Sequence, residues 1–424
     1  MIFIKLYIET LGCKVNTYES EVIKEEFLRN GYVITNRAEN ADVIVINTCS
    51  VTNQSDAKSR KIIRSARKNN PNAILVVCGC SAQNHKEDLK ELGIDILLGN
   101  KDKSIIFEYV NEYKNKSISK FYDLVHTDFE NMSLNNYSDR TRAFVKIQDG
   151  CNNYCSYCII PYLRGTIRNK DFDTAVKEIN TLVSNGFKEI VLTGIHTGSY
   201  DRFVELIKEI SKNEKLERIR ISSIEATEID EEFLSELKIN NKICDHMHIP
   251  VQAACNNTLK QMNRKYDMTK YIEIINKLRE IRPNINITTD LIVGFPTETE
   301  EDFKESLTNA SLIKFGKIHV FPYSKRDGTV ASKMNNIVSD IDKKRRTHEM
   351  LELSNKLENE YYNKFINKEL DVLIEEVKDG ISTGHTSNYI KVIINEELEH
   401  NKIYNVQIDK VDGINVYGSL VKDK

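Results

Sequence analysis

Short β-branched runs alternate with amphipathic, charge-rich segments along most of this chain. Between residues 4 and 100, strands are expected at "IKLYIETLG", "DVIVINTC", "AILVVCGC" and "IDILLG", with helices between them. This order predicts a small α/β domain, and the intervening helices require a parallel sheet. The first three strands end in or just before Cys13, Cys49 and Cys80. The three thiols should therefore meet at the carboxyl edge of the sheet.

The same alternation resumes at Arg142 and continues through six further strands and their helices. It predicts a partial (βα)6 barrel, whose site lies at the carboxyl ends of the strands. After Lys333, a charged helix leads into short strands with turn signals, which predict a small all-β module. The fold class is thus α/β with a terminal β module. We expect four segments, at 1–111 (first domain), 112–139 (connector), 140–367 (barrel with a trailing helix) and 368–424 (β module).

Composition limits the partners and the cellular compartment that the chain can have. The formal charge of its 424 residues is only −3, so any nucleic-acid site has to be a local patch. No run approaches the ~20 apolar residues of a membrane helix, and the first residues do not read as a signal peptide. We therefore expect a cytoplasmic protein with no membrane partner. Thiols stay reduced in that compartment, so the nine cysteines favour metal binding over disulfides.

Three cysteines stand within eight residues in "DGCNNYCSYCIIPYLRG", directly after the first predicted barrel strand. A structural zinc site needs a closed shell of four ligands, and no further cysteine follows before Cys244. A four-iron cluster held by three thiolates keeps one iron open for a cofactor or substrate. The spacing of Cys151, Cys155 and Cys158 therefore favours an open iron–sulfur cluster at the barrel mouth. A zinc site or redox cysteines are the alternative.

This triplet resembles the signature of the radical S-adenosylmethionine (SAM) enzymes, and the whole chain is similar to one branch, the methylthiotransferases. The resemblance covers nearly all residues and rests on "TLGCKVNTYESE", "VINTCSVT", "CGCSAQ", "GCNNYCSYCIIPYLRG", "LTGIHTGSY", "HIPVQAACNNTLKQMNRKY", "TTDLIVGFPTETEEDF" and "HVFPYSKRDGTVASKM". Within the branch, "LGCKVN" and "NTCSVT" resemble the type that modifies threonylcarbamoyladenosine in tRNA. A ribosomal-protein methylthiotransferase would more often carry proline where Lys14 stands.

The resemblance implies an amino-terminal domain with an auxiliary cluster, a radical SAM barrel, and a carboxyl-terminal TRAM domain that contacts tRNA. It implies two 4Fe-4S clusters, with Cys13, Cys49 and Cys80 as auxiliary ligands and Cys151, Cys155 and Cys158 as radical-cluster ligands. SAM would bind the free iron of the second cluster. The implied reaction is methylthio transfer to C2 of N6-threonylcarbamoyladenosine at position 37 of tRNA, next to the anticodon. The sequence identifies neither the electron donor nor the sulfur donor.

Two other functions stay open at this point. One is a methylthiotransferase that acts on another tRNA adenosine or on a ribosomal protein. The other is a non-catalytic iron–sulfur or zinc protein that binds RNA.

Four residues are further candidates for the cofactor pocket. Tyr157 lies between two ligands and is expected against the cofactor adenine, and Gly194 would let the backbone approach closely. Gln252 and Asp290, near predicted strand ends, are candidates for polar contacts. Each of the last three has a structural alternative: a turn at Gly194, backbone hydrogen bonds for Gln252, and a helix cap or structural pair for Asp290.

Of the remaining cysteines, Cys78 and Cys244 are expected to be structural, whereas Cys255 is less easily assigned to the core. Cys78 lies in the apolar run "ILVVCGC", although its spacing from Cys80 leaves it as an alternative ligand. Cys244 has no partner cysteines nearby. Cys255 stands in "PVQAAC", where the family usually shows glutamine followed by serine and glycine, and this departure leaves the local pocket open.

Basic residues suggest where RNA could bind. On the helix after Cys49, side chains recur at helical spacing on one face, namely Lys58, Lys61, Arg64 and Lys68. Such a face can hold phosphates, or it can be an ordinary solvated face. The β module is acidic at "EEVKDG" and "NEELEH". Contact with tRNA there would rest on a few residues, such as Asn388, Tyr389 and Lys391.

Overall fold

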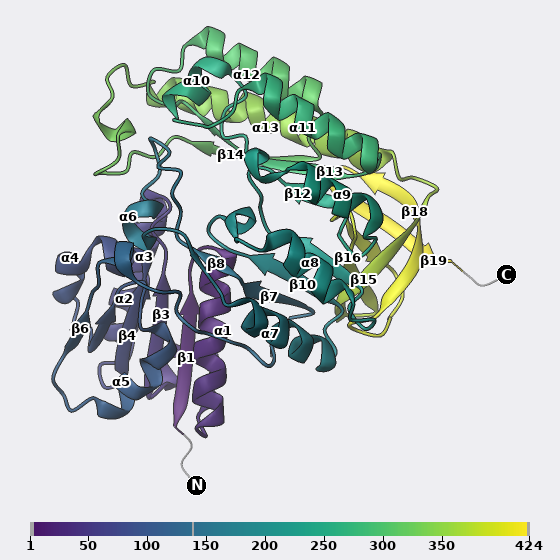
Figure 1. Cartoon of the computed structure of the whole chain (residues 1–424). Helices are drawn as coiled ribbons and strands as arrows, with labels where there is room; N and C mark the ends of the chain where they lie inside the picture. The colour runs from purple at the N-terminus through teal and green to yellow at the C-terminus, as the bar shows by residue number, and fades with distance from the viewer. Residues whose placement is uncertain (1–3, 138–139, 422–424) are drawn as a thin grey trace.

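The computed structural model describes residues 4–137 and 140–421, which form three successive parts (Figure 1). The amino-terminal part is a parallel sheet in the order β2-β1-β3-β4-β5-β6. Its strands are β1 (Lys5–Thr10), β2 (Val33–Ile34), β3 (Val43–Thr48), β4 (Ile74–Gly79), β5 (Ile96–Leu98) and β6 (Ile118–Lys120). The predicted parallel α/β domain is confirmed, and β2 and β6 extend its two edges. The sequence did not predict β2 and β6, which have two and three residues.

Helices cover both faces of this sheet because its central strands are apolar on successive residues, so apolar side chains point to both sides. Ile44, Ile46 and Val77 pack towards α2 (Asn53–Asn69). Val45, Val76 and Cys78 pack towards α1 (Lys14–Arg29) and α5 (Ile106–Glu112). Two short helices, α3 (Cys80–Asn84) and α4 (Lys86–Lys90), lie between β4 and β5. Cys78 is therefore a core residue, as expected.

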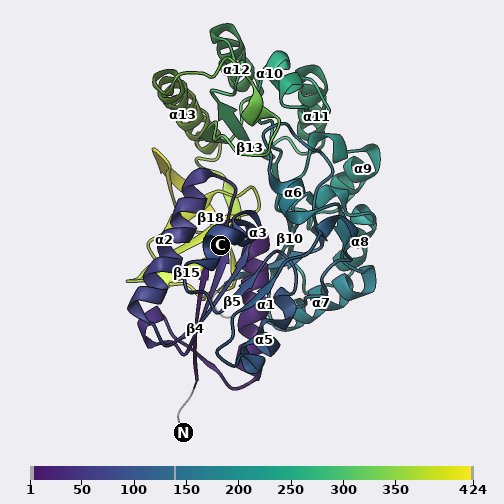
Figure 2. The same ribbon diagram turned by 90° about the vertical axis from the view of Figure 1, so that its left-hand side faces the viewer.

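The central part is an open barrel of parallel strands, as predicted. Two sheets, β11-β10-β7 and β12-β13-β14, join through a parallel bridge between Ile219 and Ile243. The strands are β7 (Arg142–Lys146), β10 (Glu189–Thr193), β11 (Arg218–Ile221), β12 (His246–His248), β13 (Asn286–Val293) and β14 (Lys317–Pro322). Their helices are α7 (Phe172–Ser184), α8 (Phe203–Ser211), α9 (Glu231–Ile239), α10 (Asn256–Gln261), α11 (Met268–Ile281) and α12 (Glu300–Ile313). Figure 2 shows this helical layer along the side of the molecule away from α2.

The carboxyl-terminal part is a small closed barrel in the order β15-β16-β17-β19-β18. It is reached through the long helix α13 (Asp340–Asn363). Its strands are β15 (Glu369–Lys378), β16 (Ile381–Thr386), β17 (Lys391–Ile394), β18 (Ile403–Asp412) and β19 (Asn415–Leu420). Arg218 on β11 donates to the carbonyls of Asp371 and His385 at 2.7 and 2.9 Å. The β module is thus anchored at the amino-terminal end of β11.

The division into 1–111, 112–139, 140–367 and 368–424 stays a prediction. Strand β6 lies within the predicted connector and pairs with β5 at the edge of the first sheet. Residues 1–3, 138, 139 and 422–424 of these segments lie outside the described residues.

Candidate active site

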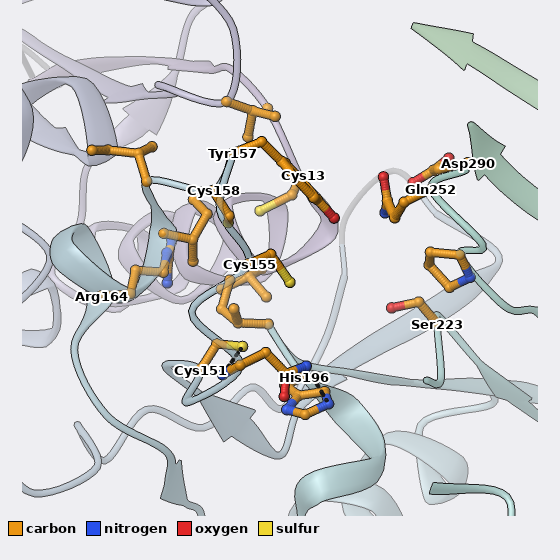
Figure 3. Close-up of a pocket in the computed structure, with 18 of the residues that line it drawn as sticks. Cys13, Cys151, Cys155, Tyr157, Cys158, Arg164, His196, Ser223, Gln252 and Asp290 are labelled. Atoms are coloured by element: carbon orange, nitrogen blue, oxygen red, sulfur yellow. Dashed lines mark hydrogen bonds between the residues drawn. The ribbon is translucent and has the colours of Figure 1, made fainter. Parts of the chain in front are cut away.

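One cavity lies between the amino-terminal sheet and the central barrel. Its volume is about 620 Å³, and its walls come from the carboxyl ends of strands in both parts. All six cysteines that the resemblance implied as ligands line it, namely Cys13, Cys49, Cys80, Cys151, Cys155 and Cys158. Figure 3 shows several of these thiols around the same space. Two sets of cysteines that are distant in sequence therefore face one chamber.

Tight glycine turns bring the first set together. Cys13 precedes α1, Cys49 follows β3, and Cys80 opens α3. Gly12 and Gly79 have φ values of +101° and +100°, which side-chain-bearing residues rarely adopt. A Cβ on Gly12 would lie 2.7 Å from Cys49 Sγ, and one on Gly79 would lie 2.5 Å from the Thr48 carbonyl oxygen. Only glycine lets these strand ends approach so closely.

A short β-ribbon closes the loop that carries the second set. Strand β8 (Gln148–Asp149) pairs antiparallel with β9 (Arg168–Asn169) across the base of the loop. At Gly150, with φ +76°, a Cβ would overlap the Thr166 carbonyl oxygen at 1.9 Å. The Cys151 N–H donates to the Gly165 carbonyl at 3.1 Å, and the Cys158 N–H to the Cys155 carbonyl at 3.0 Å. These bonds fix the loop backbone around its thiols.

Several donors point at the cysteine sulfurs. Arg264 Nη1 lies 3.4 Å from Cys155 Sγ. Arg164 Nε and Asn100 Nδ2 each lie 3.4 Å from Cys80 Sγ. Hydrogen bonds of this kind stabilise negative charge on sulfur and tune metal-bound thiolates. Burial opposes a charged ring at His196, but hydrogen bonds with Cys151 and Glu228 raise its pKa to about 10.

The protonation of the thiols tests whether this chamber suits a metal cluster. Burial raises the pKa of Cys49 to about 11 and that of Cys158 to about 12, and it also raises the pKa of Cys13. Such thiols stay neutral until a positively charged group stabilises their thiolates. Within 4–137 and 140–421, no three His, Cys, Asp or Glu side chains stand close enough to share one metal ion. Buried neutral thiols that become thiolates when a cation binds suit a metal cluster.

A buried charge cluster joins the two domains at the base of the chamber. Arg164, at the end of α6 (Ile160–Arg164), contacts Glu19 and Asp149 at 3.1 Å each. Lys103 and Lys146 also pair with Glu19. Burial disfavours charge on Glu19, yet these three cations hold its pKa well below its usual range. The helix that follows the radical-type triplet is thereby fixed to the helix that follows Cys13.

The four predicted pocket residues all line the cavity, at Tyr157, Gly194, Gln252 and Asp290. Figure 3 shows Gln252 and Asp290 on the wall that faces the labelled cysteines. Gln252 has φ +64°, and its N–H donates to the Asp290 carbonyl at 2.9 Å. Asp290 Oδ2 lies 3.5 Å from His248 Nε2. A Cβ on Gly194 would lie 2.9 Å from Gln148 Oε1, so packing also favours a glycine there.

The other cysteines lie outside the chamber. Cys244 is buried at the start of the segment that leads into β12. Cys255 is also buried, and its Sγ lies 3.2 Å from Asp302 Oδ1 and 3.5 Å from Glu305 Oε2. Neither Cys78, Cys244 nor Cys255 is among the residues that line the cavity.

The candidate RNA contacts divide into two groups. Lys58, Lys61, Arg64 and Lys68 are exposed on α2, and Lys391 is exposed at the start of β17. The other two candidates, Asn388 and Tyr389, make packing contacts within the protein. Asn388 is buried and donates to the Tyr361 hydroxyl at 3.0 Å, and Tyr389 stacks between His246 and His385 at 4.8 and 4.7 Å. Both residues lie in the turn before β17, which packs between the β module and the central barrel.

Comparison with known proteins decides the family. The radical SAM superfamily matches residues 145–310, and an uncharacterized protein family, UPF0004, matches residues 5–99. The chain is 42% identical over 400 residues to the threonylcarbamoyladenosine tRNA methylthiotransferase MtaB of Bacillus subtilis, covering 91% of this chain and 89% of that protein. The chain belongs to the radical SAM methylthiotransferase family.

A second methylthiotransferase relative has a different named product. The tRNA-2-methylthio-N(6)-dimethylallyladenosine synthase of Endomicrobium trichonymphae is 34% identical over 425 residues, covering 98% of this chain and 99% of that protein. Among solved structures, the radical SAM methyltransferase TsrM of Kitasatospora setae matches with a TM-score of 0.59 at 13% identity, covering 78% of this chain and 77% of that chain. At that identity the likeness concerns the fold alone.

Membership of this radical SAM family implies SAM and a 4Fe-4S cluster. Among the described residues of this methylthiotransferase, no helix combines the length and apolar character needed to cross a membrane.

The residues that sequence reasoning missed are the charged and polar residues around the cysteines, namely Asn16, Glu19, Asn100, Lys103, Lys146, Asp149, Arg164, His196, Glu225 and Arg264. Arg164 and Asp149 stood inside the quoted triplet motif. Their position beside the thiols of a methylthiotransferase motif was the available signal. Contacts between the two domains, such as that of Glu19 with Arg164, depend on domain docking, which local patterns do not report.

Proposed function

We propose that the chain transfers a methylthio group to C2 of N6-threonylcarbamoyladenosine at position 37 of cytoplasmic tRNA, with SAM and two 4Fe-4S clusters. The observation that carries the proposal is the single chamber lined by two sets of three cysteines from two domains. The choice of base is supported by the 42% identity to the Bacillus subtilis protein, whose name specifies that substrate.

The two cysteine sets take different roles in this proposal. Cys13, Cys49 and Cys80 would hold the auxiliary cluster. Cys151, Cys155 and Cys158 would hold the radical cluster and leave one of its irons open for SAM. Bound there, these groups would supply sulfur, a methyl group and one-electron chemistry at an unreactive C–H bond. The protein holds both clusters on one chamber, so that reactants meet at short range.

Side chains of the chamber would orient the cofactor and limit water. Tyr157, between two triplet cysteines, would lie against the adenine of SAM. Gln252 and Asp290 would offer polar contacts from the facing wall, and Gly194 would leave room along the backbone. Arg164 and Arg264 would hold sulfurs through the contacts described above.

The tRNA would approach along the basic face of α2. Val51 and Thr52 line the cavity, and α2 begins at the next residue, so this face starts at the chamber rim. Its exposed residues Lys58, Lys61, Arg64 and Lys68 would neutralise backbone phosphates. Lys391 would add a contact from the β module. No residue is assigned to the electron donor or the sulfur donor.

Two experiments test the proposal. Mass spectrometry of tRNA nucleosides from a deletion strain should show loss of 2-methylthio-N6-threonylcarbamoyladenosine and accumulation of its unmodified precursor. Loss of a dimethylallyl nucleoside instead would indicate the other tRNA substrate, and unchanged tRNA would point to a ribosomal protein or to a non-catalytic RNA-binding role.

The second experiment separates the two cysteine sets in the purified, reconstituted enzyme. Cys49→Ala should still cleave SAM reductively, because the triplet is intact, but should form no methylthioadenosine product. Cys244→Ala is the matched control, since this buried cysteine lies outside the chamber. Product formation by Cys49→Ala at the control rate would remove the auxiliary cluster from the proposal.

A further inference from the structure

Almost every basic side chain in the chamber wall already has a partner. Arg264 pairs with Glu225, Arg326 with Asp56 at 2.6 Å, and Arg164 with Glu19. The histidines are paired as well, His196 with Glu228 at 2.7 Å and His248 with Asp290 at 3.5 Å. Lys14 also lines this wall. Across residues 4–137 and 140–421, it has no hydrogen-bond or ion-pair partner.

The side chain of Lys14 is exposed, and it lines the chamber. Two arginines, Arg220 and Arg142, lie near it, together with Tyr389 and Asp290. These two arginines are already held, Arg220 by Glu189 at 2.6 Å and Arg142 by Glu375 at 3.0 Å. An exposed ammonium without a partner on the chamber wall can bind an anion that enters the chamber.

We propose that Lys14 binds the carboxylate of the threonyl group on the substrate base. The inference rests on the proposed function and adds the feature of the base that is recognised. Lys14 would thereby select this base over adenosines whose N6 substituent is uncharged.

The shape of adenine places that carboxylate near Lys14. C2 and the N6 substituent both lie on the base-pairing edge, with N1 between them. A base that presents C2 to sulfur at Cys13, Cys49 and Cys80 therefore carries its N6 substituent past the same wall. Lys14 directly follows Cys13 and opens α1, whose amino-terminal end adds partial positive charge. An anionic substituent fits there, and a neutral hydrocarbon would leave the ammonium unpaired.

Other anions are possible occupants, and the same geometry ranks them lower. Backbone phosphates belong on the exposed face of α2, outside the chamber. The carboxylate of SAM is expected at the open iron of the triplet cluster, whereas Lys14 stands on the helix that follows the other cysteine set. The test distinguishes all three.

The experiment uses the reconstituted enzyme and two anticodon stem-loop RNAs. One carries N6-threonylcarbamoyladenosine, and the other carries the same base with its carboxylate converted to the primary amide. Dissociation constants at fixed salt are measured for wild type, Lys14→Met, Lys14→Arg and Lys58→Met, together with SAM cleavage in the absence of RNA.

Wild type should bind the acid roughly 10- to 100-fold more tightly than the amide, as expected for a charge-assisted hydrogen bond. Lys14→Met should bind both RNAs equally, and Lys14→Arg should keep most of the preference. Lys58→Met should weaken both RNAs alike, because a phosphate contact does not read the base. SAM cleavage without RNA should match wild type in Lys58→Met, because Lys58 does not line the chamber.

Two results would overturn the inference and leave the proposed function standing. The first is that Lys14→Met still prefers the acid RNA over the amide RNA by the same ratio of dissociation constants as wild type. The second is loss of RNA-independent SAM cleavage in that variant, which would assign Lys14 to SAM. Failure of wild type to methylthiolate the acid RNA would instead overturn the proposed function itself, and this inference with it.

Discussion

Replacing Arg164 by methionine tests the buried charge cluster that joins the two domains. Methionine keeps much of the length of the side chain but removes its charge and its donors. Arg164 is fully buried and contacts Glu19, Asp149, Asn16 and Cys80. The change therefore removes two ion pairs and two further hydrogen bonds at once.

The expected loss of stability follows from which partners remain. Removing one member of a buried ion pair costs about 3–5 kcal/mol, because the other charge stays buried without compensation. Glu19 retains Lys103 and Lys146, and Asp149 retains Lys146 at 2.6 Å. We therefore expect a loss near the lower end, about 3 kcal/mol. This loss is in the free energy of unfolding of the first domain and the barrel, taken as one unit.

Urea unfolding of the cluster-free protein under reducing conditions measures this loss. Circular dichroism and tyrosine fluorescence serve as the two probes, because the chain has 19 tyrosines and no tryptophan. Coincident transitions are needed before a single free energy is assigned. The control is Arg202→Gln, which removes an exposed pair with Glu205 and should change the free energy of unfolding much less than Arg164→Met does.

A result within about 1 kcal/mol of wild type for Arg164→Met would refute the reasoning. It would mean that the remaining lysines compensate both carboxylates fully, and that the cluster does not hold the two domains together.

Three further predictions concern the cysteines and one domain contact. Cys155→Ala should lose about half of roughly eight bound irons, because it removes one of three ligands of a single cluster; loss of all iron would contradict two separate sites. Cys78→Ser should keep both clusters by iron analysis, because this thiol packs in the core behind the sheet. Burial opposes charge on Asp56, but hydrogen bonds from His85, Arg326 and Ser50 lower its pKa from 3.8 to about 2. The stabilisation it gives is thus present above about pH 4 and lost as the pH falls through about 2, so cluster-free wild type should lose more unfolding free energy than Asp56→Asn between pH 5 and pH 2.

The chamber could be predicted from the sequence because it depends on topology. Parallel strands place their carboxyl ends on one edge, so Cys13, Cys49 and Cys80 had to converge once the sheet was assigned. The same rule placed the triplet at the barrel mouth. Both inferences used only strand order and direction, which the period of apolar residues reports directly.

The docking contacts could not be predicted in the same way. Asn388 and Tyr389 looked like surface residues of a turn, and the structure places them between the β module and the barrel. Arg164 was visible in the motif, but its partners Glu19 and Lys103 come from another domain. A local pattern shows which face of an element is apolar and does not show which distant element covers it.

The glycines before the cysteines show how tightly the backbone is constrained at the two cysteine sets. Gly12, Gly79 and Gly150 each precede a cysteine of the chamber, and each has a positive φ. In each case an added Cβ would come within 2.7 Å of a cysteine sulfur or of a carbonyl oxygen on another segment. The cysteine positions are therefore set by close backbone contacts between segments, before any cluster is bound. Because buried charges then fix one domain against the other, the distance between the two sets is a property of the protein backbone. A chamber of this kind can present sulfur to a base at a defined place, which two flexibly linked cluster domains could not do.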